Sequence, residues 1–279
     1  MTSSTGSSGT RRSDPHGKGL HGFASEGSNM GRAALAEMIG AFFLIYTGTA
    51  TASAAASGKT IAGAPPNSLS VALAFGLVLA ALVGALAPVS GAHLNPAVTL
   101  GLAVTRRFPW RYVPAYLGFQ LIGAVLGALA TWATLGSRGA DVGSLGLTKP
   151  ADGITDGRAF LVEALITFLL VFIIIAVATD GRVAPAVAST SIGFALTAAV
   201  LIGGAITGGA VNPVRALGPE IVTGNFTSFW VYLLAPTLGG IVAAVLYDKV
   251  VRHGEAPTMD DTDQADTTAT RSRNDGASQ

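Results

Sequence analysis

Six apolar stretches, each long enough to cross a lipid bilayer, dominate the chain. Short segments with charges, Gly or Pro separate them, and they lie at about residues 33–56, 69–89, 112–135, 159–179, 183–206 and 227–248. Because the hydrocarbon core of a bilayer is about 30 Å thick, a helix needs roughly 20 apolar residues to span it. The pattern predicts an all-α membrane protein with six transmembrane helices, and the lipid bilayer is its first expected partner.

The composition excludes several classes of function but indicates no binding or catalytic site. Half of the 279 residues are hydrophobic, 12% are charged, and the net charge of +1 gives no argument for a nucleic-acid partner. The absence of Cys excludes disulfides, thiol catalysis and Cys-based metal sites. No cofactor is expected.

Two polar tails flank an apolar membrane domain at residues 31–250. The tail at 1–30 is rich in Ser and Gly and lacks the apolar core of a signal peptide, so we predict a disordered cytoplasmic tail. The tail at 251–279 carries Asp260, Asp261, Asp263 and Asp266 in a Thr-rich stretch, but the Gly and the closing Glu of an EF-hand are missing, and a solvated disordered tail is favoured over a calcium loop.

Basic residues predict the orientation, because cytoplasmic loops carry an excess of Lys and Arg. With both termini inside, the inner side holds twelve of them: Arg11, Arg12, Lys18, Arg32, Arg106, Arg107, Arg111, Arg182, Lys249, Arg252, Arg271 and Arg273. The outer side holds Lys59, Arg138, Lys149 and Arg158. We therefore expect a multi-pass protein of the cell membrane with both termini in the cytoplasm.

A sequence repeat divides the domain in two. When Asn95 is placed over Asn212, SGAHLNPAVTLG at residues 90–101 aligns with TGGAVNPVRALG at residues 207–218. Glu37 in the first apolar stretch likewise matches Glu163 in the fourth. Each repeat, at about 31–135 and 157–250, contains three spans, so the second copy enters the membrane from the opposite side. Such inverted repeats place a solute path at the interface of the two halves.

Each repeat also contains an apolar segment that is too short to cross the membrane. Asn is a preferred N-cap and Pro a preferred first helical residue, so Asn95-Pro96 and Asn212-Pro213 each begin a helix. The predicted segments, 95–105 and 212–222, reach about 15 Å, half of the hydrocarbon core. An ordinary turn would explain one Asn-Pro, but two at matching offsets favour re-entrant half-helices whose N-terminal ends meet at the midplane.

These motifs resemble the aquaporin (major intrinsic protein) family, whose mark is a pair of Asn-Pro-Ala boxes. The boxes here are Asn95-Pro96-Ala97 and Asn212-Pro213-Val214, followed by Arg215, and the resemblance covers about residues 30–250. Val214 departs from the usual Ala but leaves both Asn donors in place. The resemblance implies a passive channel, and a homotetramer with one pore in each subunit.

The half-helices suggest how such a pore would exclude charge. Two positive helix ends at the midplane repel cations. The amides of Asn95 and Asn212 can donate hydrogen bonds to a passing water, whose oxygen then cannot readily accept a proton. Neutral solutes would pass while protons would not.

The resemblance also implies a selectivity filter, found here by counting from the boxes. Phe75, Val200, Gly209 and Arg215 occupy the filter positions, where a strict water channel would have His and a larger loop residue in place of Val200 and Gly209. Arg215 could instead be a snorkelling anchor, but its place matches the filter Arg of the family.

Other polar residues of the spans have two interpretations each. Glu37 and Glu163 could relay protons, but acceptance of hydrogen bonds from the re-entrant loops is favoured. His93 lines the inner pore or packs in its loop, and Gln120 is a loop or pore hydrogen-bond partner. Gly118, Gly123 and Gly127 are predicted to be close helix contacts.

Three functions compete at this point. A membrane enzyme or metal site is disfavoured, because three of the four His lie in the tails and the spans hold no cluster of ligands. An ion-coupled transporter would need titratable groups along its path. A passive channel for water and small uncharged solutes is favoured.

A few residues near the second box indicate which solutes the channel would conduct. Ala216 and Glu220 differ from the Asp and the basic residue of glycerol channels, whereas Tyr232-Leu233 and the small filter residues resemble the nodulin-like intrinsic proteins of plants. Glycerol, boric acid or arsenous acid are therefore expected beside water, with a strict water channel as the alternative.

Overall fold

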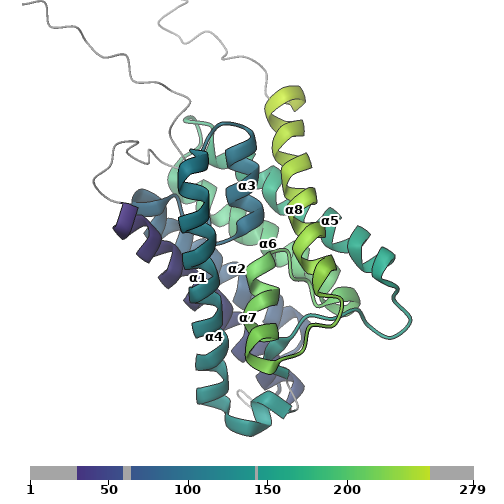
Figure 1. Ribbon diagram of the computed structural model, residues 1–279. Helices are drawn as coiled ribbons and strands as arrows, with labels where there is room; N and C mark the ends of the chain where they lie inside the picture. Colours follow the sequence, from purple (N-terminus) through teal and green to yellow (C-terminus); the bar gives the residue numbers. More distant parts are fainter. Residues whose placement is uncertain (1–29, 59–63, 142–143, 252–279) are drawn as a thin grey trace, which may run out of the picture.

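The computed structural model describes residues 30–58, 64–141 and 144–251, and its regular elements are helices (Figure 1). The predicted disordered tails, with the Asp-rich stretch, lie outside the described residues. Six long helices are apolar enough to cross a membrane: α1 (Met30–Ala56), α2 (Ser68–Ser90), α4 (Val113–Asp141), α5 (Asp156–Ala178), α6 (Pro185–Thr207) and α8 (Phe229–Leu246). The six predicted spans are thus confirmed, each with ends close to the expected residues.

The largest difference lies at the end of α4, which continues beyond the predicted residue 135. Gly136 interrupts its helical backbone with a φ of 66° and a ψ of −162°. Glycine tolerates this region because it has no Cβ. The regular part of α4 therefore ends where the apolar stretch does.

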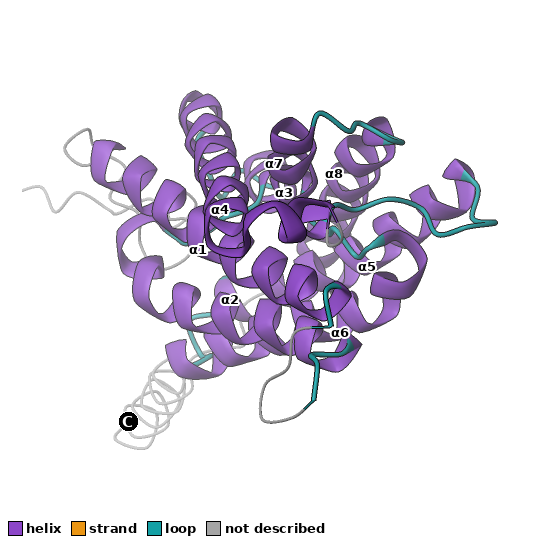
Figure 2. Ribbon diagram, turned by 90° about the horizontal axis from the view of Figure 1, so that it is seen from below, coloured by secondary structure: helices purple, strands orange, loops and turns teal. Residues whose placement is uncertain are grey.

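Two short helices, α3 (Pro96–Val104) and α7 (Pro213–Thr223), begin at the two Asn-Pro pairs. They have 9 and 11 residues, which corresponds to about 14 and 17 Å. In Figure 1 α3 lies above α7, and the view along the perpendicular direction in Figure 2 places the two labels together. Two half-helices approaching from opposite sides, as the sequence predicts, complete the inverted repeat.

The packing of the helices follows this repeat. Helix α1 packs on α4 as α5 packs on α8, and α1 packs on α2 as α5 packs on α6. Helix α3 packs on α8, and α7 packs on α4, so each half-helix is held by the last long helix of the other repeat. Neither repeat can bury its own half-helix completely, which makes the two halves one folding unit.

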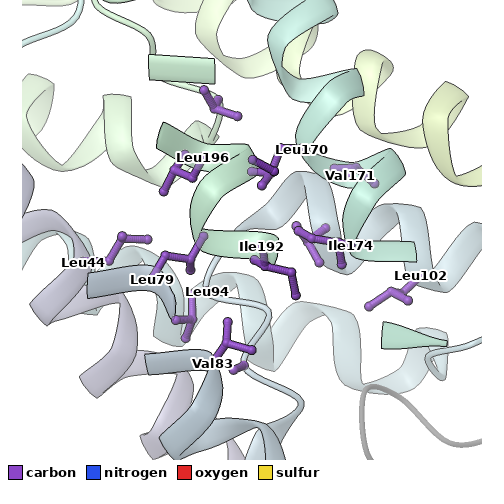
Figure 3. Packing of buried hydrophobic residues seen from close by; sticks show 14 of the residues in the cluster. Leu44, Leu79, Val83, Leu94, Leu102, Leu170, Val171, Ile174, Ile192 and Leu196 are labelled. Carbon is purple, nitrogen blue, oxygen red and sulfur yellow. The ribbon is translucent and has the colours of Figure 1, made fainter. Parts of the chain in front are cut away.

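The interface between the repeats is apolar. In Figure 3 Leu79 and Val83 of α2 lie opposite Ile192 and Leu196 of α6, with side chains of α5 beside them. All of these side chains are buried. Single turns complete the described fold at η1 (Trp110–Tyr112), η2 (Ser144–Gly146) and η3 (Tyr247–Val251, a π-turn).

Small residues allow the long helices to touch. A Cβ at Gly123 would lie 2.2 Å from the carbonyl oxygen of Met38, and one at Gly127 2.7 Å from that of Phe42. These two predicted contacts are confirmed. The prediction for Gly118 is wrong, because a Cβ there would meet no atom within 4 Å; this position of α4 faces away from the neighbouring helices.

Candidate functional site

The two Asn residues of the boxes tie the half-helices together. The amide Nδ2 of Asn95 donates to the carbonyl oxygen of Val211 at 3.0 Å, and Nδ2 of Asn212 donates to that of Leu94 at 2.8 Å. Each Oδ1 caps its own helix, accepting from the backbone N–H of Ala97 at 2.9 Å and of Val214 at 3.1 Å. An amide has two N–H donors, so each Asn keeps one for a molecule beside it.

The substitution of Val for Ala in the second box leaves this geometry intact. Val214 is buried, and its backbone N–H makes the same capping bond that Ala97 makes in the first box. Pro96 and Pro213 each hold the first helical position, where a missing N–H costs nothing. Both boxes therefore present their Asn side chains in the same way.

Glu37 supports the loop that precedes α3. Its carboxylate is fully buried and accepts four hydrogen bonds, from the Ser90 hydroxyl, the backbone N–H groups of His93 and Leu94, and Gln120 Nε2, at 2.6 to 2.9 Å. Gln120 also donates to the Thr99 hydroxyl at 3.1 Å. This geometry agrees with the loop-supporting interpretation of both residues.

Glu163 does the same for the loop that precedes α7. It accepts from the Thr207 hydroxyl at 2.6 Å and from the backbone N–H groups of Ala210 and Val211, both at 2.9 Å. No side-chain amide among the described residues donates to it, in contrast to Gln120 beside Glu37. The second loop is thus held by one hydrogen bond fewer.

Both loops need this support because their backbones are strained. Leu94 and Val211, the residues before the two Asn, have φ values of 52° and 59°. Side chains other than Gly, Asn and Asp rarely adopt this left-handed region. The strain turns the carbonyl groups of Leu94 and Val211 toward the Asn of the other repeat.

Two Tyr residues complete this support, a role that the sequence interpretation assigned to neither of them. The hydroxyl of Tyr116 on α4 donates to the Ser90 carbonyl at 2.6 Å, and that of Tyr232 on α8 donates to the Thr207 carbonyl at 2.8 Å. Both Tyr side chains are buried. The two Tyr residues occupy matching positions in the third long helix of each repeat, and this match in the sequence could have indicated their shared role.

A cavity lies beside the N-terminal ends of α3 and α7. Side chains from both repeats line it: Leu44, Phe75, Leu79, Val83, Ala92, His93, Asn95, Val98, Leu170, Ile174, Ile192, Leu196, Ala210, Asn212 and Arg215. Most are apolar. The exceptions, His93, Asn95, Asn212 and Arg215, are the polar residues that the sequence pattern had indicated.

Arg215 and Phe75 lie together at this cavity. The guanidinium carbon of Arg215 is 5.1 Å from the centre of the Phe75 ring, a cation–π geometry. Gly48 makes room for the ring, since a Cβ there would lie 2.0 Å from it. Arg215 is only 4% exposed, and its Nε and Nη1 have no hydrogen-bond partner among the described residues. These two nitrogens are buried within the protein, while the residue as a whole lines the cavity.

Val200 and Gly209 also lie together, but they are not among the residues that line the cavity. A Cβ at Gly209 would be 3.3 Å from Val200 Cα and 3.2 Å from the Gly204 nitrogen. The φ of Gly209 is 58°. Gly209 thus allows its loop to approach α6 closely, a role that its residue type alone does not show.

His93 has both of the surroundings that were considered for it. It lines the cavity, and its ring packs against Phe108 and Tyr116 with centroid distances of 4.8 and 5.0 Å. Nδ1 lies 3.1 Å from the Thr99 hydroxyl, whereas Nε2 has no partner within the described part of the chain. The ring therefore lines the cavity while one of its nitrogens is buried without a partner.

The polar side chains that line the cavity are spread along it rather than clustered. Within the described residues no three His, Asp or Glu side chains gather to hold a metal ion. The buried carboxylates Glu37 and Glu163 are engaged by their loops. The cavity offers hydrogen-bond donors at separated points along an apolar wall.

Comparisons with known proteins agree with this arrangement. Residues 25–247 match the major intrinsic protein family. Aquaporin NIP3-1 of Oryza sativa subsp. japonica is 39% identical over 80% of this chain and 70% of its own length, and Nodulin-26 of Glycine max is 39% identical over 83% and 82%. The X-ray structure of the aquaglyceroporin from Plasmodium falciparum aligns with a TM-score of 0.72 at 28% identity, covering 80% of this chain and 97% of that one.

The match spans both boxes, both supporting Glu residues and all six long helices. The chain therefore belongs to the major intrinsic protein family and is a membrane channel for water and small solutes.

Proposed function

We propose that the channel conducts water together with small neutral polyols or metalloid hydroxides, such as glycerol, boric acid or arsenous acid, and excludes protons and ions. The observation that carries this proposal is the pair of cross-linked Asn residues at one cavity. Asn95 and Asn212 each donate one side-chain N–H to the loop of the other repeat, and the second N–H of each amide remains available to a solute in the cavity. Two fixed donors at the midplane suit any small molecule with a hydroxyl or water oxygen.

Charge exclusion follows from the same geometry. The N-termini of α3 and α7 meet at the cavity, and each carries the equivalent of roughly half a positive charge. A water that accepts from both Asn amides has its oxygen lone pairs occupied, so it does not relay a proton along the column. Apolar walls on either side offer a dehydrated ion no replacement ligands.

The filter at Phe75, Val200, Gly209 and Arg215 is proposed from the family positions together with two contacts. Arg215 supplies donors above the Phe75 ring. Val200 and Gly209, in contact with each other, contribute neither a donor nor bulk. Of these four residues Phe75 and Arg215 line the cavity, so the proposed filter has donors on one side only, which suits molecules larger than water.

The comparisons support this wider filter. One similar structure is described as an aquaglyceroporin, and several relatives are nodulin-like aquaporins. Ala216 and Glu220 still argue against a channel for glycerol alone. A strict water channel is the second candidate, because the apolar wall offers few donors to a polyol.

Stopped-flow light scattering on proteoliposomes under gradients of water, glycerol, urea and boric acid tests the choice. Wild-type protein should conduct water and at least one solute, whereas conduction of water alone would favour the second candidate. Val200→His should suppress solute flow and spare water, with Val200→Leu as the apolar control. Substitution of Gly209 is unsuitable, because its φ of 58° and its contact with α6 would strain any side chain.

The channel domain is proposed to work as a homotetramer in the cell membrane, with both termini in the cytoplasm. Support for the assembly comes from family membership, and support for the orientation comes from the bias of Lys and Arg. Light scattering of the detergent-solubilised protein and protease protection of terminal tags test these two points separately.

A further inference from the structure

We propose that Thr99 is a positioning residue for His93: its hydroxyl fixes the imidazole as the neutral tautomer with the proton on Nδ1, so that the ring offers no proton relay in the cavity. The inference deepens the proposed exclusion of protons and rests on it. Thr99 lies on α3, is fully buried and is not among the residues that line the cavity, so it acts through His93 and does not touch a solute.

Three polar groups surround the hydroxyl of Thr99. Gln120 Nε2 and His93 Nδ1 each lie 3.1 Å from its Oγ1, and so does the backbone carbonyl oxygen of Asn95 on the same half-helix. A hydroxyl has one proton and two acceptor lone pairs. Three neighbours therefore use it completely, and the direction of each hydrogen bond follows from a count of protons.

The bond from Gln120 has its direction fixed by Glu37. Gln120 Nε2 donates to Glu37 Oε2 at 2.7 Å and, with its second N–H, to Thr99. The Glu37 carboxylate also accepts from a Ser hydroxyl and from two backbone N–H groups of the loop. A turned amide would direct its oxygen at this acceptor. Thr99 therefore accepts from Gln120, which leaves one lone pair and one proton for His93 and Asn95.

Two observations place the Thr99 proton toward Asn95 and the ring proton of His93 on Nδ1. If Thr99 donated to Nδ1, its remaining lone pair would face the Asn95 carbonyl oxygen at 3.1 Å without a proton between them. The ring proton would then lie on Nε2, which is buried and has no partner among the described residues. A buried N–H without an acceptor is rare and costs free energy. With the proton on Nδ1, every proton of the network has an acceptor.

The same count disfavours a charged ring. An imidazolium carries protons on both nitrogens, so it too would leave an N–H on Nε2 without an acceptor. The rings of Phe108 and Tyr116 pack against the imidazole with centroid distances of 4.8 and 5.0 Å. This packing holds Nδ1 toward Thr99.

The fixed tautomer prevents a relay through His93. An imidazole relays a proton when one nitrogen accepts it and the other releases its own to a neighbouring acceptor. The proton on Nδ1 faces an oxygen that already accepts from Gln120. Thr99 could pass its own proton only to the Asn95 carbonyl, which is held in the helical bond with the Thr99 N–H at 3.0 Å. His93 thus adds neither a charge nor a relay to the cavity.

Nitrogen-15 NMR of histidine-labelled, full-length protein in proteoliposomes tests the assignment, because the shift of each ring nitrogen depends on whether it carries the proton. His16, His21 and His253 are replaced by Gln, which leaves His93 as the one labelled ring. We expect the Nδ1–H form to exceed the Nε2–H form about tenfold or more, as the cost of an unsatisfied buried donor implies. A relay passes through both forms in turn, so a single form also argues against a relay.

Variants at position 99 show whether its hydroxyl is the cause. Thr99→Val keeps the shape but removes the hydroxyl, so either ring proton would lack an acceptor and the ratio of Nδ1–H to Nε2–H should fall to about one or below. Thr99→Ser should preserve the ratio of the wild type. Thr131→Val, which removes a buried hydroxyl that bonds to Thr49 between α1 and α4, is the matched control and should also preserve it. Water permeability of the same vesicles shows that the channel is intact.

A dominant Nε2–H form or an imidazolium in the protein with Thr99 would overturn the proposal, and this result does not depend on the folding of any Thr99 variant. A ratio in Thr99→Val equal to that of Thr99→Ser would overturn it as well. A proton leak through the wild-type channel would instead refute the proposed exclusion of protons, and the NMR spectrum, recorded without a gradient, would still decide the tautomer.

Discussion

The side-chain amide of Asn212 donates a hydrogen bond to the backbone carbonyl of Leu94, 118 residues earlier in the chain, at 2.8 Å. The reciprocal bond joins Asn95 to Val211. The two Asn residues proposed to line the centre of the pore therefore also hold the two repeats together. Under this proposal, stability and conduction depend on the same side chains.

Replacement of Asn212 by Ala should weaken both properties. The N-cap of α7 and the bond to Leu94 are lost together, and we expect a cost of about 2 kcal/mol in the free energy of unfolding. Thermal unfolding in detergent measures the loss, and stopped-flow scattering measures the accompanying fall in water permeability.

Asn95→Ala is the matched variant, because its cap and its cross-repeat bond are equivalent. The two variants should be similarly destabilised. A clear loss in only one of them would show that the link between the two repeats is not symmetric in its energetics.

Replacement of the two supporting Glu residues by Gln should destabilise the protein to different extents. In Glu163→Gln the new amide group leaves one loop N–H without an acceptor, at a cost of about 1–3 kcal/mol. In Glu37→Gln one loop N–H, that of His93 or Leu94, loses its acceptor as well. There, however, the amide of Gln120 can turn so that its Oε1, which has no partner among the described residues, accepts from the new amide group, which in Glu163→Gln meets no such acceptor. We expect Glu163→Gln to be the more destabilising change.

Unfolding temperatures of both Gln variants check this order, with Glu37→Gln/Gln120→Ala as a third protein that lacks the adaptable amide. That double variant should lose the advantage of Glu37→Gln. Equal stability of the single variants would mean that Gln120 does not adapt.

Much of this architecture was predictable from the sequence, for identifiable reasons. Charges and Gly or Pro delimit the spans, so their ends could be placed within a few residues. Asn95-Pro96 and Asn212-Pro213 carry their own helix-start chemistry. The repeat turned two isolated Glu residues into a pair, which favoured loop support over proton relay.

Other features depend on the backbone of the folded chain. The bonds from Asn95 and Asn212 to opposite carbonyls require positive φ at Leu94 and Val211, which neither residue type suggests. The close approach of Gly209 to Val200 arises in the same way. Gly118 was misjudged because composition does not tell which face of a helix touches a neighbour.

The two Gly residues of α4 make that last point testable. Gly123→Ala would place a Cβ 2.2 Å from the Met38 carbonyl, and overpacking of this kind typically costs about 1–3 kcal/mol. Gly118→Ala, on the same helix, meets nothing within 4 Å and should be neutral or slightly stabilising. Thermal unfolding of the two variants compares them directly. A larger loss for Gly118→Ala would contradict the described packing of α1 on α4.

Removal of the filter charge gives the last prediction. Arg215→Val should leave water flow present but allow protons or cations to leak, because the guanidinium and the half-helix ends share the exclusion of positive charge. The proton leak of Arg215→Val should exceed that of substitutions at the apolar lining residues, because Arg215 is the cation that lines the cavity in the described structure. Proton flux into vesicles loaded with a pH-sensitive dye measures the leak, with water permeability recorded in parallel. Arg158→Val, which removes an exposed charge near the start of α5, should leave both fluxes unchanged. An unaltered proton flux in Arg215→Val at retained water permeability would place the whole barrier at Asn95 and Asn212, and the filter would then select solutes by size alone.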